Sequence, residues 1–119
     1  MKGTLANCAE HQKELVSGNI FIRPCILGKK GDFVDGHKHN FDHTTIFLEG
    51  SFHVVMKDPD GTVRETDAVS PTHLLIRKEV EHRIELTSEG AGRFWCVYSH
   101  RDQNGGVIQE SNHNLDAYG

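Results

Sequence analysis

Histidine is the residue type whose abundance and spacing point most directly to chemistry in this chain. The 119 residues include nine histidines against eight leucines, although leucine is normally among the commonest residues of a globular domain. His37 and His39 are two positions apart, and on a strand this spacing puts both side chains on one face. His43 follows where the intervening residues can turn the chain back. Because imidazole is the commonest protein ligand of transition metals, the segment predicts a metal site. A polar loop that is merely rich in histidine is the alternative.

The charge pattern limits the partners that this site can serve. The net charge is −4, and the basic residues are scattered, with Lys29-Lys30 and Arg77-Lys78 as the only adjacent pairs. Nucleic-acid binding depends on clustered cations, so we expect no nucleic-acid partner. The sequence has no apolar run of about 18 residues, so we expect no membrane partner either. A small molecule remains the expected ligand.

The N-terminal sequence and the cysteines indicate a cellular compartment. The first residues lack the apolar core of a signal peptide, so we expect a cytoplasmic protein. Cys8, Cys25 and Cys96 are widely spaced and form neither a disulfide framework nor a metal-binding pair. We therefore expect reduced thiols.

Short apolar runs separated by turn residues predict an all-β domain that carries the histidines. Asp58-Pro59-Asp60-Gly61 is a strong hairpin turn, and no stretch keeps a helical period for three turns. Several short strands with such turns favour a sandwich or barrel. The expected division is an N-terminal arm (1–18), a β-barrel (19–101) and a polar C-terminal tail or dimer arm (102–119). The expected strands are 20–27, 44–48, 52–56, 62–66, 74–76, 83–86 and 94–98.

The spacing Gly31-x5-His37-x-His39-x3-His43-x6-Gly50 resembles the first motif of the cupin superfamily, in which a glutamate stands where this chain has His43. The segment Ile76–Ile84 is similar to the second cupin motif in degraded form. There His82 falls on the motif's histidine, while the proline, glycine and asparagine positions are replaced. The two segments cover residues 31–86, and the flanking strands extend the resemblance to about 20–100.

The resemblance implies a single-domain cupin-type jelly-roll β-barrel, commonly dimeric, that holds one divalent metal ion. It implies His37, His39 and His82 as ligands, with His43 in the place of the glutamate ligand. A free pocket base is the alternative role for His43. The ligands do not identify the metal, which can be Fe, Mn, Ni, Co, Zn or Cu. The resemblance also implies a homodimer.

Strand alternation predicts which other side chains face the interior. If His82 points inward, Ile84 and Leu86 do so too, while Arg83 and Glu85 face water. The remaining histidines are expected to lie near strand ends, in terminal segments or, for His53, on the outer surface. The candidate pocket residues are Thr45 and Phe47 on the strand of His43, Cys96 and Tyr98 on a late strand, and Arg23 as an anion-binding group.

These residues predict a metal-dependent enzyme acting on a small anionic or chelating molecule. Neutral imidazole ligands leave the charge of a divalent ion uncancelled, which attracts a carboxylate, enolate or catecholate. Within this class we favour dioxygenase-like chemistry. The alternatives are non-redox lyase, isomerase or cyclase chemistry, with Tyr98 as a weak candidate acid or base, and a non-catalytic ligand-binding cupin.

Overall fold

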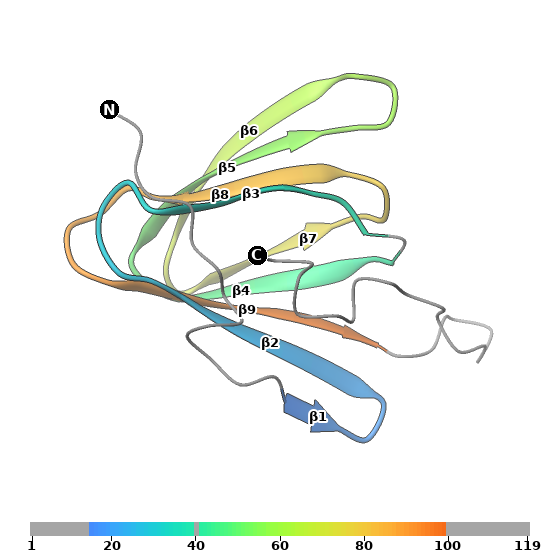
Figure 1. Ribbon diagram of the computed structural model, residues 1–119, viewed down its shortest axis with the longest axis horizontal. Helices are drawn as coiled ribbons and strands as arrows, with labels where there is room; N and C mark the ends of the chain where they lie inside the picture. The colour runs from blue at the N-terminus through green and yellow to red at the C-terminus, as the bar shows by residue number, and fades with distance from the viewer. Residues whose placement is uncertain (1–14, 40, 100–119) are drawn as a thin grey trace.

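The computed structural model describes residues 15–39 and 41–99, apart from the side chains of Gly36 and His37, and this part of the chain is built from β-strands (Figure 1). Within these ranges no helix is long and apolar enough to cross a membrane. The strands are β1 (Leu15–Ser17), β2 (Ile20–Leu27), β3 (Phe33–His37), β4 (His43–Glu49), β5 (Ser51–Lys57), β6 (Val63–Val69), β7 (Thr72–Ile76), β8 (Glu81–Leu86) and β9 (Gly92–Ser99).

The strands form two antiparallel sheets that face each other. One sheet has the order β1-β2-β9-β4-β7 and the other has the order β3-β8-β5-β6. Figure 1 shows the chain passing repeatedly from one sheet to the other. This is the jelly-roll arrangement that the cupin resemblance implies, and it agrees with the sandwich or barrel expected from the alternation of short strands and turns. The sequence did not reveal two strands: β1, which lies within the expected arm, and β3, which leads into the histidines.

The pairing of β3 with β8 brings the two histidine-bearing segments together. Val34 pairs with Ile84 and His37 pairs with His82, with a register shift between the two pairs. A bulge of this kind adds a residue to one strand and bends it. On the facing sheet, β4 lies between β9 and β7, and His43 pairs with Ile76. The start of β8 therefore lies beside the end of β3, while the start of β4 lies on the facing sheet.

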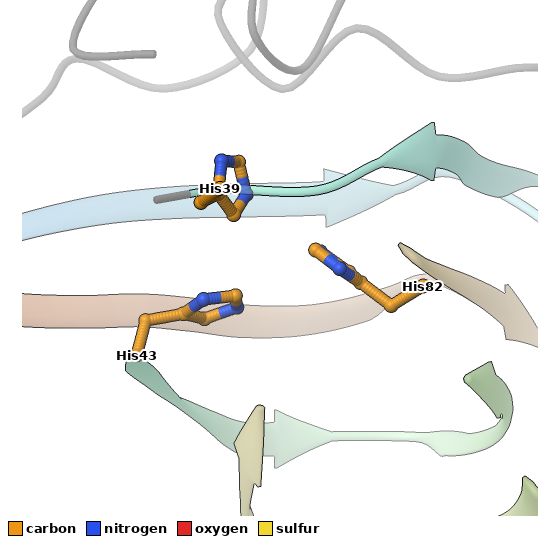
Figure 2. A group of neighbouring side chains, drawn as sticks. All are labelled: His39, His43 and His82. Atoms are coloured by element: carbon orange, nitrogen blue, oxygen red, sulfur yellow. The ribbon is translucent and has the colours of Figure 1, made fainter. Parts of the chain in front are cut away.

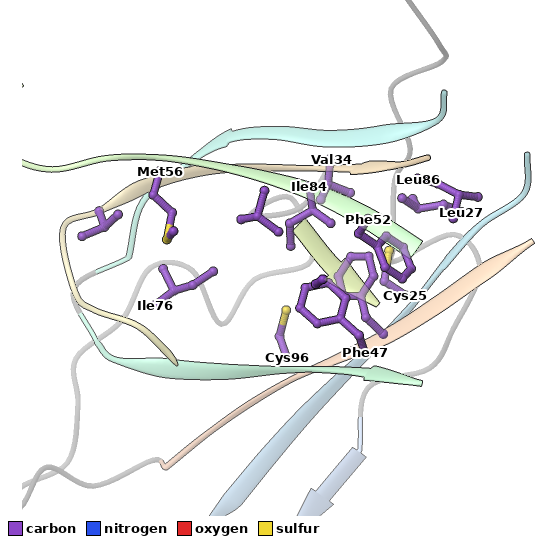
Figure 3. Close-up of a cluster of buried hydrophobic side chains, with 14 residues drawn as sticks. Cys25, Leu27, Val34, Phe47, Phe52, Met56, Ile76, Ile84, Leu86 and Cys96 are labelled. Carbon is purple, nitrogen blue, oxygen red and sulfur yellow. The ribbon is translucent and has the colours of Figure 1, made fainter. Parts of the chain in front are cut away.

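The interior between the sheets is filled by alternate side chains of the strands (Figure 3). On β8, His82, Ile84 and Leu86 are buried while the residues between them are half-buried, as alternation predicts. The main core contains Phe47, Phe52 and Phe94 at its centre. A second, smaller cluster consists of Phe21, Phe41 and Tyr98.

The two glycines of the histidine motif occupy backbone conformations that favour glycine. Gly31 has φ 95° and Gly50 has φ 93°, which is the left-handed region that other residues rarely adopt. Gly50 also joins β4 directly to β5, and an added Cβ atom would lie 3.1 Å from Leu86 Cδ1. The two glycines of the motif are thus explained by turns. Gly31 lies just before β3, and Gly50 lies at the end of β4 that is opposite His43.

Gly92 tests the packing at the start of β9. An added Cβ atom would lie 2.5 Å from Leu86 Cδ1 and 2.8 Å from Phe52 Cζ. We expect Gly92→Ala to lower the free energy of unfolding by about 1–3 kcal/mol, because overpacking forces side chains out of their rotamers. Urea unfolding measures this change. Gly28→Ala is the matched control, since its Cβ atom would have an ordinary 3.7 Å contact with Asp32; equal stability losses for the two variants would contradict the packing described here.

Candidate metal centre

Three histidine side chains from three separate elements converge inside the barrel (Figure 2). His39 lies in the connection after β3, His43 is the first residue of β4, and His82 is the second residue of β8. One nitrogen from each ring lies within 4.8 Å of the others. The ring centroids are 5.2 Å apart for His39 and His43, 5.3 Å for His39 and His82, and 5.1 Å for His43 and His82.

The three imidazoles are buried, and His43 is the most informative of them. The exposed fractions of His39, His43 and His82 are 3%, 2% and 3%. Neither ring nitrogen of His43 has a hydrogen-bond partner among the described residues. Burial, followed by repulsion from positive charge on His82 and His39, holds the pKa of His43 well below its ordinary value of 6.5. His43 is therefore neutral at physiological pH, with a lone pair available for a ligand.

Backbone contacts hold the connection before β4 against the turn before β8. The Glu79 N–H donates to the carbonyl oxygen of His39 at 2.6 Å, and the Lys78 N–H donates to Asp42 Oδ1 at 2.7 Å. His82 Nδ1 lies 3.2 Å from the carbonyl oxygen of Val80. If Nδ1 carries the proton of this contact, Nε2 of His82 is left as the metal-binding atom.

Apolar side chains surround the histidines on both sides. Met56 pairs with His82 across the sheet, Ile76 pairs with His43, and both belong to the main core. On the other side the ring of Phe41 stacks on His39, with 4.8 Å between centroids and 17° between planes. The centre therefore lies in largely apolar surroundings, where electrostatic interactions are stronger than in water.

This donor set fits a divalent transition metal. Imidazole nitrogens suit Zn, Cu, Fe and Ni, and metal coordination would satisfy one of the two ring nitrogens of His43 that otherwise have no partner. A buried polar atom without a partner is costly, so such atoms in a native fold usually mark a ligand or an ordered water. The position of His43 as the first residue of β4 aims its ring at the other two. Its observed surroundings are those of a ligand.

The fourth expected ligand, His37, is described only by its backbone. His37 is the last residue of β3, and its Cα atom pairs with that of His82; its side chain lies outside the described part of the chain. The strand geometry that would put His37 and His39 on one face does not extend to both residues, because β3 ends at His37 and His39 lies in the connection that follows.

Three of the expected pocket residues line the barrel at increasing depth from the histidines. Thr45 pairs with Cys96, and Thr45 Oγ1 lies 3.9 Å from Cys96 Sγ. Both are buried, two positions along their strands from His43 and Tyr98. Phe47 is deeper still, with its ring packed 4.9 Å from Phe52 and 5.9 Å from Phe94. At about 3.3 Å per residue, Phe47 is roughly 13 Å along β4 from His43, which places it in the main core.

Arg23 and Tyr98 are the other two expected pocket residues, and both are buried. Arg23 is 1% exposed and lies two positions from both Phe21 and Cys25, which are also buried. Its side chain therefore lies on the same inner face of β2 as theirs. Its Cα atom pairs with that of Cys96, and its guanidinium carbon lies 5.8 Å from the centroid of the Phe21 ring. Tyr98 is 4% exposed and stacks on Phe41 with 4.0 Å between centroids.

The cysteines correct one expectation. Cys96 is a buried thiol outside any disulfide, but Cys25 is disulfide-bonded, so the expectation of reduced thiols is wrong for Cys25. Disulfides persist mainly in oxidising environments. The spacing of the cysteines in the sequence gave no sign of this bond, because chain distance does not report distance in space. The expectation for Cys8 lies outside the described residues.

The other described histidines lie away from this centre. His53 is on the outer face of β5, where its ring nitrogens lie 2.7 Å from Asp67 Oδ1 and 2.9 Å from Glu65 Oε1. These carboxylates raise the pKa of His53. His73 is exposed on β7. The remaining histidines (His11, His100 and His113) lie outside the described residues.

Sequence reasoning missed Phe41 and the turn before β8. Phe41 is two positions from both His39 and His43, and it is 3% exposed. The alternation of His39, Phe41 and His43 was the available signal. The turn before β8 gave none, because it acts through the backbone groups of Lys78, Glu79 and Val80 rather than through their side chains.

No protein-family model matches this sequence, and no curated protein matches it. The fold matches solved structures. One is an RmlC-like cupin family protein with a double-stranded β-helix fold from Methanocaldococcus jannaschii, with a TM-score of 0.61 at 16% identity, over 73% of this chain and 76% of that chain. Another is a protein containing a cupin-2 domain from Shewanella frigidimarina, with a TM-score of 0.57 at 14% identity, over 75% of this chain and 81% of that one.

A larger enzyme contains the same fold. A variant of oxalate decarboxylase from Bacillus subtilis matches with a TM-score of 0.63 at 20% identity, over 76% of this chain but only 24% of the enzyme. The chain therefore has the cupin fold, which confirms the expected fold class.

Proposed function

We propose that the protein is a metal-dependent cupin enzyme that acts on a small anionic or chelating molecule, with dioxygenase-like chemistry. The observation that carries the proposal is the buried group of His39, His43 and His82, whose ring nitrogens lie within 4.8 Å of one another. A site of this kind costs stability unless it binds something. The fold is shared with an oxalate decarboxylase, whose name gives its substrate as a small chelating anion.

His37 would complete the ligand set. Its Cα atom pairs with that of His82, and paired positions of antiparallel strands lie close together. A site with only imidazole ligands keeps the full charge of the ion. Such a site favours an anionic ligand over a neutral one.

The interior of the barrel adds to this preference. The buried polar and charged side chains of the described residues are Arg23, His39, His43, Thr45 and His82, which include a guanidinium and no carboxylate. A ligand that enters from the histidines toward Thr45 and Cys96 approaches the level of Arg23. We propose that Arg23 favours an anionic group on this ligand, because a guanidinium binds carboxylates well.

A divalent metal in this centre would act as a Lewis acid or as the site of oxygen activation. The protein's own residues hold and shield that chemistry. His43 stays neutral and needs no deprotonation to bind. Phe41, Met56 and Ile76 keep bulk water from the ligand nitrogens, which strengthens the interaction between metal and anion.

Non-redox lyase, isomerase or cyclase chemistry is the second candidate, and Tyr98 is the observation that favours it. Its ring is buried and stacks on Phe41, which itself stacks on His39. A phenol in this position can give or take a proton. A ligand-binding cupin without catalysis, and the homodimer that the cupin resemblance implies, remain parts of the hypothesis to be tested.

Metal analysis combined with oxygen uptake tests the proposed function. We expect protein purified without added metal to hold a stoichiometric divalent ion, and the iron-loaded protein to consume oxygen with a substrate among small carboxylates, enolates or catecholates. His82→Ala should lose both properties, while His73→Ala, an exposed histidine, should keep them. Turnover without oxygen uptake would favour the non-redox candidate. Metal content unchanged in His82→Ala would overturn the site itself.

A further inference from the structure

We infer that Phe41 is a positioning residue that fixes the ring of His39 for metal binding. The inference rests on the proposed function, because it concerns the metal that His39, His43 and His82 would hold. Nothing in the histidine spacing assigns Phe41 a role. Its part follows from its contacts in the folded chain.

Phe41 belongs to a series of stacked rings that begins at His39. The planes of His39 and Phe41 are 17° apart with 4.8 Å between centroids. Phe41 stacks on Tyr98 at 4.0 Å and 25°, and Tyr98 stacks on Phe21 at 4.9 Å and 28°. The three aromatic residues form the smaller hydrophobic cluster and are all buried. Tyr98 lies on β9 and Phe21 on β2, which pair with each other.

This stack orients the ring of His39, which the connection after β3 holds only through its backbone. His43 and His82 lie on strands, so neighbouring strands restrict their side chains. His39 lies outside a strand, and its backbone is held by the Glu79 N–H. That backbone contact does not by itself set the plane of the buried imidazole. The stack on Phe41 restricts rotation of the ring about its side-chain bonds and links its orientation to two paired strands of the barrel.

The ring plane of His39 matters because the three ligands meet at different angles. The plane of His39 makes an angle of 74° with His43 and 52° with His82. Rotation of the His39 ring would move its ligand nitrogen away from the other two. A site whose ligands are already oriented loses less conformational entropy when the metal binds. Removing the flat face of Phe41 should therefore weaken metal binding even if the apolar volume is kept.

Phe41→Leu tests this role, with Phe47→Leu as the matched control. Both positions are buried phenylalanines, but Phe47 packs against Phe52 and Phe94 in the main core. The measurements are Co(II) and Zn(II) affinity by competition with a chelator, and the visible absorption spectrum of the Co(II) protein. We expect Phe41→Leu to lower affinity about 10–100-fold, as is typical when an outer partner of a metal ligand is lost, and to alter the Co(II) spectrum.

The controls separate positioning from general stability. Phe47→Leu should lower thermal stability but leave metal affinity and the Co(II) spectrum unchanged. Phe41→Tyr keeps the stacking ring and should restore most of the affinity that Phe41→Leu loses. Should Phe41→Leu fail to fold, Tyr98→Leu provides the second variant, because it removes the ring on which Phe41 stacks. It should also weaken binding and change the spectrum.

Two results would overturn the inference, and they differ from failure of the proposed function. Wild-type affinity and spectrum in Phe41→Leu, or in Tyr98→Leu where that variant is used, would exclude positioning by the stack. Equal loss of affinity in Phe47→Leu would show an effect of stability alone. The metal centre itself fails if His39→Ala binds metal as the wild-type protein does, and in that case the inference about Phe41 fails with it.

Discussion

Replacing His43 with leucine should abolish metal binding and at the same time stabilise the metal-free protein. The ring of His43 is 2% exposed, and neither ring nitrogen has a hydrogen-bond partner among the described residues. Burying a polar atom without a partner costs about 1–3 kcal/mol. Leucine has a similar volume and no polar atom, so we expect the free energy of unfolding of the metal-free protein to rise by about 1–3 kcal/mol. The same substitution removes one of the three clustered ligands, so metal binding should be lost.

The measurements are metal content by mass spectrometry and urea unfolding in the presence of a chelator. His73→Leu is the control, because His73 is exposed on β7 and should affect neither property. A drop in the stability of metal-free His43→Leu would mean that His43 makes a favourable interaction without metal. Retained metal in that variant would remove His43 from the ligand set. Only the combination of lost metal and higher stability agrees with a histidine that binds metal and lowers the stability of the metal-free fold.

Much of the fold was predictable from local patterns, because a half-buried strand alternates between its two faces. On β8 the alternation of His82, Ile84 and Leu86 with charged residues predicts the observed burial. The segment Asp58-Pro59-Asp60-Gly61 predicted a hairpin turn, and the pairing of β5 with β6 across it confirms this. By contrast, β3 was hidden, because Asp35 and Gly36 interrupt its apolar pattern. Its pairing with β8 is a long-range contact that no local pattern encodes.

The centre was predictable only in the identity of its histidines. Spacing and the cupin resemblance singled out His39, His43 and His82, which the fold brings together. What holds them there was not visible, since the contacts of Glu79 and Lys78 are made by backbone N–H groups. Arg23 shows a further limit. It was a candidate pocket residue on its chemistry alone, because a charged residue inside a strand ordinarily faces water and no local pattern indicated its burial inside the barrel.

Lowering the pH should reduce the free energy of unfolding of the metal-free protein more steeply than the titration of exposed histidines alone would. The pKa of His43 is lowered by burial and by repulsion from His82 and His39, whereas in the unfolded chain it returns to about 6.5. The unfolded chain therefore binds a proton that the folded protein excludes. The stability contributed by neutral His43 is complete above pH 6.5 and is lost as pH falls from there toward the lowered pKa of the folded state. Each excluded proton costs up to about 1.4 kcal/mol per pH unit in this window.

His53 gives this prediction an internal control, because its contribution to stability has the opposite sign. Asp67 and Glu65 raise the pKa of His53, so its contribution is complete below pH 6.5 and is lost as pH rises through the raised value. The exposed contacts of His53 make this effect small. Urea unfolding in chelator between pH 7.5 and 5 should show a slope that His43→Leu reduces by about one proton, while His53→Gln leaves the acid side nearly unchanged. An unchanged slope in His43→Leu would mean that the folded protein accepts a proton at His43 as readily as the unfolded chain does, and a centre that is readily protonated would bind metal weakly at neutral pH.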